Sequence, residues 1–402
     1  MKLKRLTALL LSVMLVLSLA ACGGGKDTKD DSAGGDLSGK EIIIGNITPV
    51  TGAQAAYGLA ITNSIQMAID EINADGGILG ATVKLSTKDD QGTPAEAVSG
   101  FNSLLSEGAA AIIGATLSSC TSAITSLADD EGIVLVTPSS TADSITTTDD
   151  YVFRSCFKDS FQGEMVAAYA KDQGWTKAAV LYATGDTYSS GLHDSFVKAA
   201  EKYGIEIVCE QSSSDTGAVD FSSQLATIAA SGADMLFAPY YYDAVGPKII
   251  PQAREAGFKG AILGTDTVDN NMVLESAKGK DVRLLVTTFY QEGGSPEFDA
   301  GIKQWLNENP DMMTNNGGND VVAGVTAMGY DAYFTALAAI KAADSTDPAK
   351  ILEALPGVHY EGVTGVVEFD EIGDAKRDAA YIKEANPETG AWEFVAVQTV
   401  EQ

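Results

Sequence analysis

The sequence has 402 residues, with 26 basic and 55 acidic side chains and a formal net charge of −29 at pH 7. A surface this acidic repels nucleic acid and anionic membranes, so we expect neither as a partner. The two histidines, His193 and His359, lie far apart, and the chain has no metal-ligand spacing, nucleophile elbow or phosphate loop. We therefore expect a binding protein with no catalytic residue, no cofactor and no metal.

The N-terminus has the pattern of an export signal. A basic start precedes an apolar run from about Leu6 to Ala21, which is too short to span a bilayer. The run ends in Leu-Ala-Ala-Cys22, which resembles a bacterial lipobox, so residues 1–21 would be a lipoprotein signal peptide and Cys22 the lipidated N-terminus. A plain secretory signal with an incidental cysteine is the alternative. Cleavage would leave 23 basic and 55 acidic residues and a charge of −32.

Residues 22–40 contain a single large apolar side chain, Leu37, and are expected to form a flexible tether. The body that follows has about 360 residues, too many for one ordinary core, which predicts two domains. In its first half, strand-like runs at 42–47, 83–87, 110–114 and 132–138 alternate with helical stretches at about 61–72 and 94–105 and a hydroxyl-rich helix from Thr116. This order predicts a parallel sheet with right-handed crossovers.

The same alternation restarts after residues 151–153. Strands are expected at 178–183, 204–210, 233–239 and 261–265, with helices at 191–203, 219–230 and 244–256 between them. A strand at 283–290 then precedes a long helix that includes residues 325–340. The predicted fold class is α/β, with two doubly wound parallel-sheet units.

Polar residues gather where these strands end. They are Thr116 to Ser119, Ser139, Ser140 and Thr141 in the first unit, and Thr184 to Tyr188, Tyr240 to Asp243 and Asp266 in the second. Ligands of open α/β sheets bind outside the carboxyl ends of the strands. A cleft between the two units would therefore bring hydroxyls against aromatic side chains and an acid.

Five stretches carry a resemblance that covers nearly the whole chain after residue 41. They are residues 42–58, 67–80, 112–142, 252–266 and 362–374. In this order and spacing they resemble the branched-chain amino-acid (Leu/Ile/Val)-binding proteins of bacterial ABC importers, in lipoprotein form. The resemblance implies the type I periplasmic binding protein fold, in which two lobes close on an amino acid.

The resemblance also implies three chain crossovers between the lobes, near residues 157–159, 287–290 and 362–365. Lobe 1 would then comprise residues 41–158 and 288–363. Lobe 2 would comprise residues 159–287 and 364–402, which makes its C-terminal segment discontinuous with the rest.

By the same resemblance, Ser118 and Thr141 would hold the ligand carboxylate, and the Ser139 carbonyl and Asp266 would hold its ammonium. Ser140 lies between two of these positions and is a further candidate. A carboxylate at a helix start can accept bonds from hydroxyls and backbone amides, although Ser118 could simply cap the helix. The family carries a glutamate where this chain has Asp266, so the acid is one methylene shorter. Asp266 could instead cap a helix near 270–276.

Tyr57, Tyr188, Tyr240 and Tyr242 are the aromatic candidates for the ligand side chain, with core or surface roles as the alternative. Tyr241 should point the opposite way in an extended stretch and is expected in packing or at the surface.

Three cysteines follow Cys22: Cys120, Cys156 and Cys209. At most one disulfide can form among them, and small core residues are the preferred interpretation. The family's disulfide in the first lobe cannot form, because Leu117 occupies one partner's position. Cys120 could have a depressed pKa at a helix start, but a buried, inert thiol is the expectation.

These features predict a monomeric solute receptor, anchored to the outer face of the cell membrane by lipidated Cys22. It would capture a small amino acid, branched-chain or otherwise apolar, and deliver it to an ABC permease with its ATPase. The alternatives are a sensory binding module, and a binder of polar amino acids, urea, amides or aromatic acids.

Overall fold

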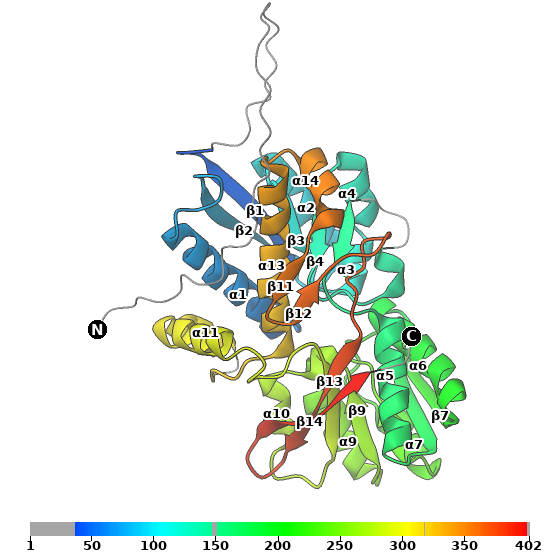
Figure 1. Ribbon diagram of the computed structural model, residues 1–402. Coiled ribbons are helices and arrows are strands. Elements are labelled where there is room, and N and C mark those ends of the chain that lie inside the picture. The colour runs from blue at the N-terminus through cyan, green and yellow to red at the C-terminus, as the bar shows by residue number, and fades with distance from the viewer. Residues whose placement is uncertain (1–36, 147–150, 317, 400–402) are drawn as a thin grey trace, which may run out of the picture. The chain divides into compact units, whose positions relative to one another are not determined.

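A computed structural model describes residues 37–146, 151–316 and 318–399. The predicted signal peptide, most of the tether and Cys22 lie outside the described residues. The described chain forms a five-stranded sheet of order β2-β1-β3-β4-β5, a seven-stranded sheet of order β14-β13-β10-β9-β8-β6-β7 and a ribbon of β11 and β12. Figure 1 shows the elements grouped around the two large sheets. We call the group around the five-stranded sheet lobe 1 and the group around the seven-stranded sheet lobe 2.

Lobe 1 has the predicted β-α alternation, and all of its sheet pairings are parallel. Its strands are β1 (Glu41–Thr48), β2 (Thr82–Asp89), β3 (Ala111–Gly114), β4 (Leu135–Thr137) and β5 (Val152–Arg154). Its first helices are α1 (Ala55–Ala74), α2 (Pro94–Glu107), α3 (Ser118–Ser122) and α4 (Thr125–Glu131). Proline in the first turn of α2 and left-handed Gly108 after its end set the bounds of that helix.

Lobe 2 contains a parallel core to which the C-terminal segment adds two antiparallel strands. The parallel strands are β6 (Lys177–Ala183), β7 (Glu206–Ser213), β8 (Met235–Phe237), β9 (Ala261–Gly264) and β10 (Leu284–Thr288), and the antiparallel ones are β13 (Ala379–Asn386) and β14 (Ala391–Thr399). The helices are α5 (Asp159–Asp172), α6 (Thr187–Tyr203), α7 (Ser222–Ala230), α8 (Tyr242–Ala244), α9 (Ile250–Glu255) and α10 (Asn271–Ala277). The sequence analysis missed β13 and β14.

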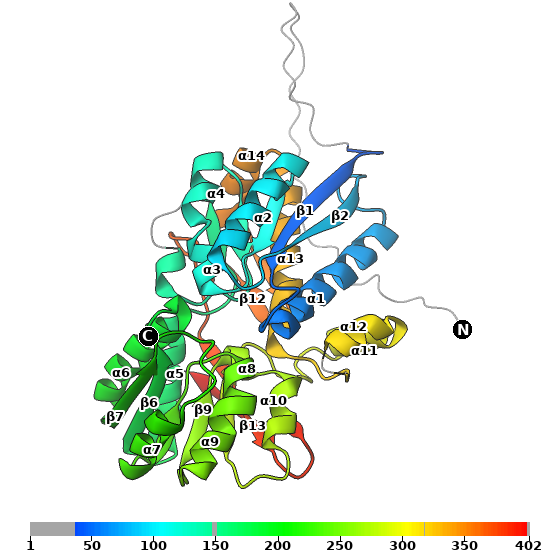
Figure 2. The ribbon, with the colours of Figure 1, turned by 180° about the vertical axis from the view of Figure 1, so that it is seen from behind.

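The segment between β10 and β13 runs through α11 (Pro296–Glu308), α12 (Pro310–Asn315), α13 (Gly324–Ala343), α14 (Pro348–Ala354), β11 (Tyr360–Gly362) and β12 (Gly365–Val367). Helix α13 lies beside α1, as Figures 1 and 2 both show, so this segment returns to lobe 1. An isolated bridge then pairs Arg154 of β5 with Asp374. The chain therefore stays beside the first sheet well past residues 362–365, where the third crossover was predicted, and the residue boundaries of the lobes remain a prediction.

Several helix starts differ from those expected. Helix α6 begins at Thr187 rather than Gly191, because the Asp186 carboxylate accepts the Ser189 amide at 2.8 Å and caps the helix. The expected helix 244–256 is divided into α8, a π-helical turn at Val245–Ile249 and α9. The hydroxyl-rich helix is likewise divided into α3 and α4.

The alternative role of Asp266 as a helix cap is wrong. Asn270 caps α10, since its side-chain oxygen accepts the Met272 amide at 2.9 Å, whereas Asp266 opens a separate 3-10 turn at Asp266–Val268.

The three described cysteines are free thiols. Cys120 and Cys156 are fully buried, which confirms the core interpretation for both, and Cys209 is half-buried. Burial raises the pKa of the Cys120 thiol, so the alternative of a depressed pKa is wrong. Among the described residues, no helix is long and apolar enough to cross a membrane, and no cluster of three His, Cys, Asp or Glu side chains could hold a metal ion.

A buried ion pair ties lobe 1 to the segment that leads into β13. Arg154 is wholly buried, and its Nη2 lies 2.6 Å from Oδ1 of Asp374. The guanidinium also donates to Thr146 Oγ1 at 3.0 Å and to the carbonyl of Ala142 at 2.6 Å. One side chain therefore holds the loop after β4 and the approach to lobe 2 together.

We expect Arg154→Ala to lower the free energy of unfolding by about 3–5 kcal/mol, because it removes the buried partner of Asp374 and leaves the partly exposed Lys158 ammonium, 3.3 Å from Oδ2, to balance the buried carboxylate. Chemical denaturation measures the change. Arg283→Ala is the matched control, because the Arg283–Glu384 pair is partly exposed and should contribute under about 1 kcal/mol. Equal losses in the two variants would contradict the assignment.

Candidate functional site

Asp266 is the centre of a buried polar cluster that joins the two lobes. It follows β9 and is 1% exposed. The Tyr57 hydroxyl, from α1 of lobe 1, donates to its Oδ2 at 2.9 Å. From lobe 2, the Tyr188 hydroxyl lies 2.8 Å from its Oδ1, and Gln162 Nε2 donates to the same oxygen at 3.0 Å. The structure therefore brings together three of the predicted site residues and adds Gln162.

The protonation of this cluster follows from its burial. Burial raises the pKa of Asp266 to about 6, although the hydrogen bonds from Tyr188, Tyr57 and Gln162 oppose the shift. Burial also raises the pKa of Tyr57 and of Tyr188 well above the ordinary value. Both phenols therefore remain protonated at neutral pH and can donate to the carboxylate.

Beside this cluster, several buried side-chain atoms have no hydrogen-bond partner. They are Thr141 Oγ1, both carboxyl oxygens of Asp159 and Gln162 Oε1. The Asp159 amide donates to the Thr141 carbonyl at 2.7 Å, so Thr141 of lobe 1 lies at the start of α5 in lobe 2. Burial raises the pKa of Asp159 well above its ordinary value. Buried polar atoms normally have partners, so these atoms are candidates for binding a ligand.

The sequence analysis missed Asp159 and Gln162. The two residues lie one helical turn apart at the start of α5, where the first crossover between the lobes is predicted. A carboxylate and an amide at such a place border any cleft between the lobes, and this signal could have identified them.

The hydroxyl-bearing residues divide into two groups. The Ser118 hydroxyl accepts the Ala142 amide at 3.3 Å, which places the start of α3 beside Thr141. Ser139 Oγ donates to the Thr116 carbonyl at 2.8 Å, and Ser140 Oγ donates to the Ala115 carbonyl at 3.0 Å. The hydroxyls of Ser139 and Ser140 therefore fix the loops of lobe 1, while the Thr141 hydroxyl faces the Asp159 carboxyl without a hydrogen bond of good geometry.

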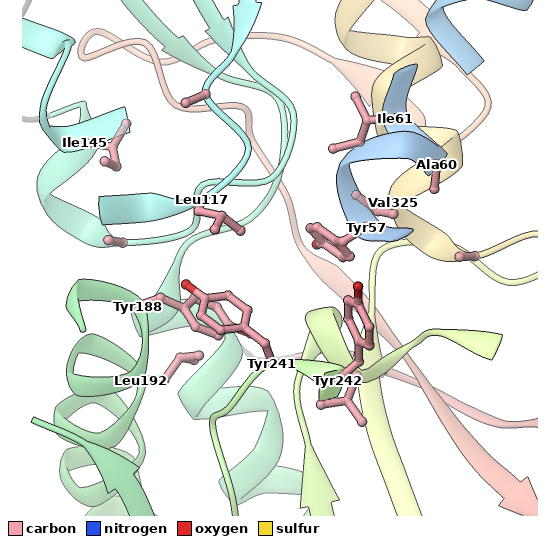
Figure 3. Close-up of a cluster of buried hydrophobic side chains, with 14 of the residues drawn as sticks. Tyr57, Ala60, Ile61, Leu117, Ile145, Tyr188, Leu192, Tyr241, Tyr242 and Val325 are labelled. Atoms are coloured by element: carbon pink, nitrogen blue, oxygen red, sulfur yellow. The ribbon is translucent and has the colours of Figure 1, made fainter. Parts of the chain in front are cut away.

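Tyr241, in the loop after β8, packs against one of the predicted site residues. The Tyr241 ring stacks on Tyr188 with centroids 5.3 Å apart and an interplanar angle of 15°, as Figure 3 shows. It is buried beside the predicted site and not at the surface. The expected alternation fails here because α8 begins at Tyr242 and ends the extended stretch.

The structure does not bring the hydroxyls of Tyr240 and Tyr242 to Asp266. Tyr240 OH lies 2.8 Å from Ser213 Oγ, at the end of β7 within lobe 2. Tyr242 OH donates to the Ala53 carbonyl at 2.8 Å and accepts the Ala56 amide at 3.1 Å, both at the N-terminus of α1. Tyr240 therefore has a bond inside its own lobe, and Tyr242 bridges the lobes.

The assembled site brings two kinds of polar group together among buried side chains. Carboxyl groups of Asp266 and Asp159 suit a small cation, and the hydroxyls of Ser118 and Thr141 suit an anion. The buried rings of Tyr57 and Tyr188 lie beside Asp266, and Tyr241 stacks on Tyr188.

Three known proteins of similar sequence and fold have names that describe binding of amino acids. A leucine-, isoleucine-, valine-, threonine- and alanine-binding protein of Pseudomonas aeruginosa is 27% identical over 85% of this chain and 88% of its own length. The structure of a leucine-binding protein, LivK, from Thermotoga maritima matches with a TM-score of 0.79 and 29% identity, covering 89% of this chain and 99% of that one. The structure of LivJ from Streptococcus pneumoniae in complex with isoleucine matches with a TM-score of 0.78 and 27% identity, covering 90% and 99%.

A family model described as periplasmic binding protein matches residues 41–389. This match takes in the five-stranded sheet, the seven-stranded sheet except β14, the segment between β10 and β13 and every residue of the Asp266 cluster. The chain belongs to the periplasmic binding protein family.

Proposed function

We propose that this protein is the extracytoplasmic receptor of an ABC importer, and that it captures a small apolar amino acid between its lobes and delivers it to the permease. The observation that carries the proposal is that Asp266 bonds to both lobes and lies beside buried polar atoms of both lobes that have no hydrogen-bond partner. The names of the relatives support the choice of amino acid, since those proteins bind leucine, isoleucine and valine.

The ligand ammonium would lie between the carboxyl groups of Asp266 and Asp159. A protonated amine has three donors and no acceptor, so it can satisfy several acceptors at once. Burial raises the pKa of Asp159, and the nearby charge of Asp266 raises it further. A bound cation would stabilise both carboxylates, which favours an amine over a neutral ligand.

The ligand carboxylate would lie between Ser118 and Thr141. The unpaired Thr141 hydroxyl is the natural donor, and Ser118 lies beside the Thr141 loop through its contact with the Ala142 amide. Because α3 has only five residues, hydroxyls and local amides would contribute more to this grip than a helix dipole.

The ligand side chain would lie against the aromatic group. Figure 3 shows Leu117, Tyr57, Tyr188 and Tyr241 around the same region, and all four side chains are buried. At its edge, the Tyr241 hydroxyl lies 3.4 Å from the Asp186 carboxylate. Aliphatic side chains fit such surroundings best, because burying apolar area is favourable and a polar side chain would lose its hydration.

Lobe closure would convert ligand binding into a signal for the permease. The ligand touches both lobes only when they are closed, so it stabilises the closed form by its extra contacts there. Lipidation at Cys22 would keep the receptor at the outer face of the membrane, beside the permease. Lipidation, partner and location all rest on the sequence pattern at residues 1–22 and on the family.

A ligand panel tests the proposal directly. The tether-free body, residues 38–402, is refolded to remove carried-over ligand, and thermal shifts are measured with the amino acids, urea, amides and aromatic acids. Leucine, isoleucine or valine at about 100 times its dissociation constant should stabilise the fold by roughly 2.7 kcal/mol. Leucinamide and isoamylamine should bind far more weakly, because neither presents a carboxylate. A shift from an amide or an aromatic acid alone would overturn the proposal.

We expect Asp266→Ala to weaken binding of the responding amino acid by about 2–5 kcal/mol, because it removes one partner of a buried charged hydrogen bond. Calorimetric titration measures the change. Asp281→Ala, at an exposed position of the same lobe, is the control and should leave the affinity unchanged. A loss below about twofold in Asp266→Ala would remove Asp266 from the ammonium site.

Binding should weaken as the pH falls through the pKa of Asp266, which burial raises to about 6. Below this pH the carboxyl is protonated, and the proton must leave before an ammonium can bind. The affinity should therefore fall by about tenfold between pH 7 and pH 5. Because burial raises its pKa, protonation of Asp266 does not itself destabilise the free fold. A flat profile, with no proton release on binding at pH 6, would contradict the role of Asp266.

A further inference from the structure

The N-terminus of α1 is satisfied from the opposite lobe. Gln54 occupies the cap position, but its side chain makes no capping hydrogen bond. The Tyr242 hydroxyl accepts the Ala56 amide at 3.1 Å and donates to the Ala53 carbonyl at 2.8 Å. Tyr242 is 3% exposed, and burial raises its pKa to about 12, so its hydroxyl keeps its proton. Figure 3 shows this hydroxyl directed at the turn that carries Tyr57.

A second bond between the lobes lies beside the first. Gln54 Nε2 donates to Asp243 Oδ1 at 3.1 Å, and Lys248 Nζ lies 3.4 Å from the other oxygen of the same carboxylate. Tyr242 and Asp243 are consecutive residues of α8 in lobe 2. Their two side chains therefore contact Ala53, Gln54 and Ala56, at the start of α1 in lobe 1.

The bonds of Tyr242 and Asp243 to lobe 1 use none of the atoms of the proposed ligand site. Tyr242 and Asp243 contact the backbone and Gln54, while Asp266, Asp159 and Thr141 provide the polar atoms of the proposed ligand site. This separation distinguishes Tyr242 from Tyr188, whose hydroxyl reaches Asp266. The contacts exist only when the lobes are together, because separating them moves the Tyr242 hydroxyl away from α1.

We propose that Tyr242, with the Gln54–Asp243 bond, is a latch that holds the closed form, and that it sets how long a bound ligand stays without touching it. Tyr242 is a positioning residue, because it holds the start of α1 against lobe 2. Its two bonds are made after the lobes meet, so their loss accelerates opening and leaves ligand entry unchanged. The effect on ligand residence rests on the proposed function, whereas the effect on closure does not.

Tyr242→Phe removes the hydroxyl and keeps the ring, which isolates the latch from packing. We expect the dissociation rate of isoleucine, measured by stopped-flow fluorescence, to rise about three- to tenfold, while the association rate stays within about twofold. Gln54→Ala should raise the dissociation rate in the same direction by a smaller factor. Tyr203→Phe is the matched control, because the Tyr203 hydroxyl bonds to Glu164 within lobe 2, and it should leave both rates unchanged.

A ligand-free measurement separates the latch from the proposed function. Hydrogen exchange of the Ala56 amide should be faster in ligand-free Tyr242→Phe than in the parent protein, and unchanged in Tyr203→Phe, because the Tyr242 hydroxyl accepts this amide whenever the lobes meet. If isoleucine does not bind, the proposed amino-acid function fails and the exchange rate still decides the latch. Unchanged exchange in Tyr242→Phe would overturn the latch. Faster exchange with an unchanged dissociation rate would overturn its control of ligand residence.

Discussion

The wholly buried guanidinium of Arg154 organises the region on which both the site and the lobe connection depend. It pairs with Asp374 and also donates to the carbonyl of Ala142, directly after Thr141. A buried guanidinium without these partners would be costly, so the loop after β4 and the segment before β13 have one favourable arrangement around it. The position of the Thr141 hydroxyl and the approach to lobe 2 are thus set by the same side chain.

Burial of acidic groups between the lobes gives the site its electrostatic character. The protein is acidic throughout, but exposed carboxylates are hydrated and screened. Asp266 and Asp159 are 1% exposed, and burial raises the pKa of both. Hydrogen bonds from Tyr57 and Gln162 keep Asp266 closer to ionisation than burial alone would allow. A cation with several donors would complement such a pair better than water does, which supports the proposed amine ligand.

The hydroxyls of four tyrosines have different partners, which supports the different roles proposed for them in ligand recognition and closure. Tyr57 and Tyr188 approach the same carboxylate from opposite lobes, Tyr240 bonds within lobe 2, and Tyr242 bonds to the backbone of α1. Ring packing alone would not distinguish these roles, because all four side chains are buried. The hydrogen-bond partner of each hydroxyl decides its role.

The sequence by itself predicted the alternation of strands and helices in both lobes, their parallel pairing and the position of Asp266 after β9, because local hydrophobic periodicity and turn residues encode them. It also predicted the aromatic character of the site and the proximity of Ser118 and Thr141 to each other. Strands β13 and β14, the division of residues 244–256 and the partners of Tyr240, Tyr241 and Tyr242 were decided only by the tertiary structure. Asp159 and Gln162 joined the site for the same reason. These features depend on which residues distant in the chain face each other across the lobes, and local periodicity carries no information about such pairs.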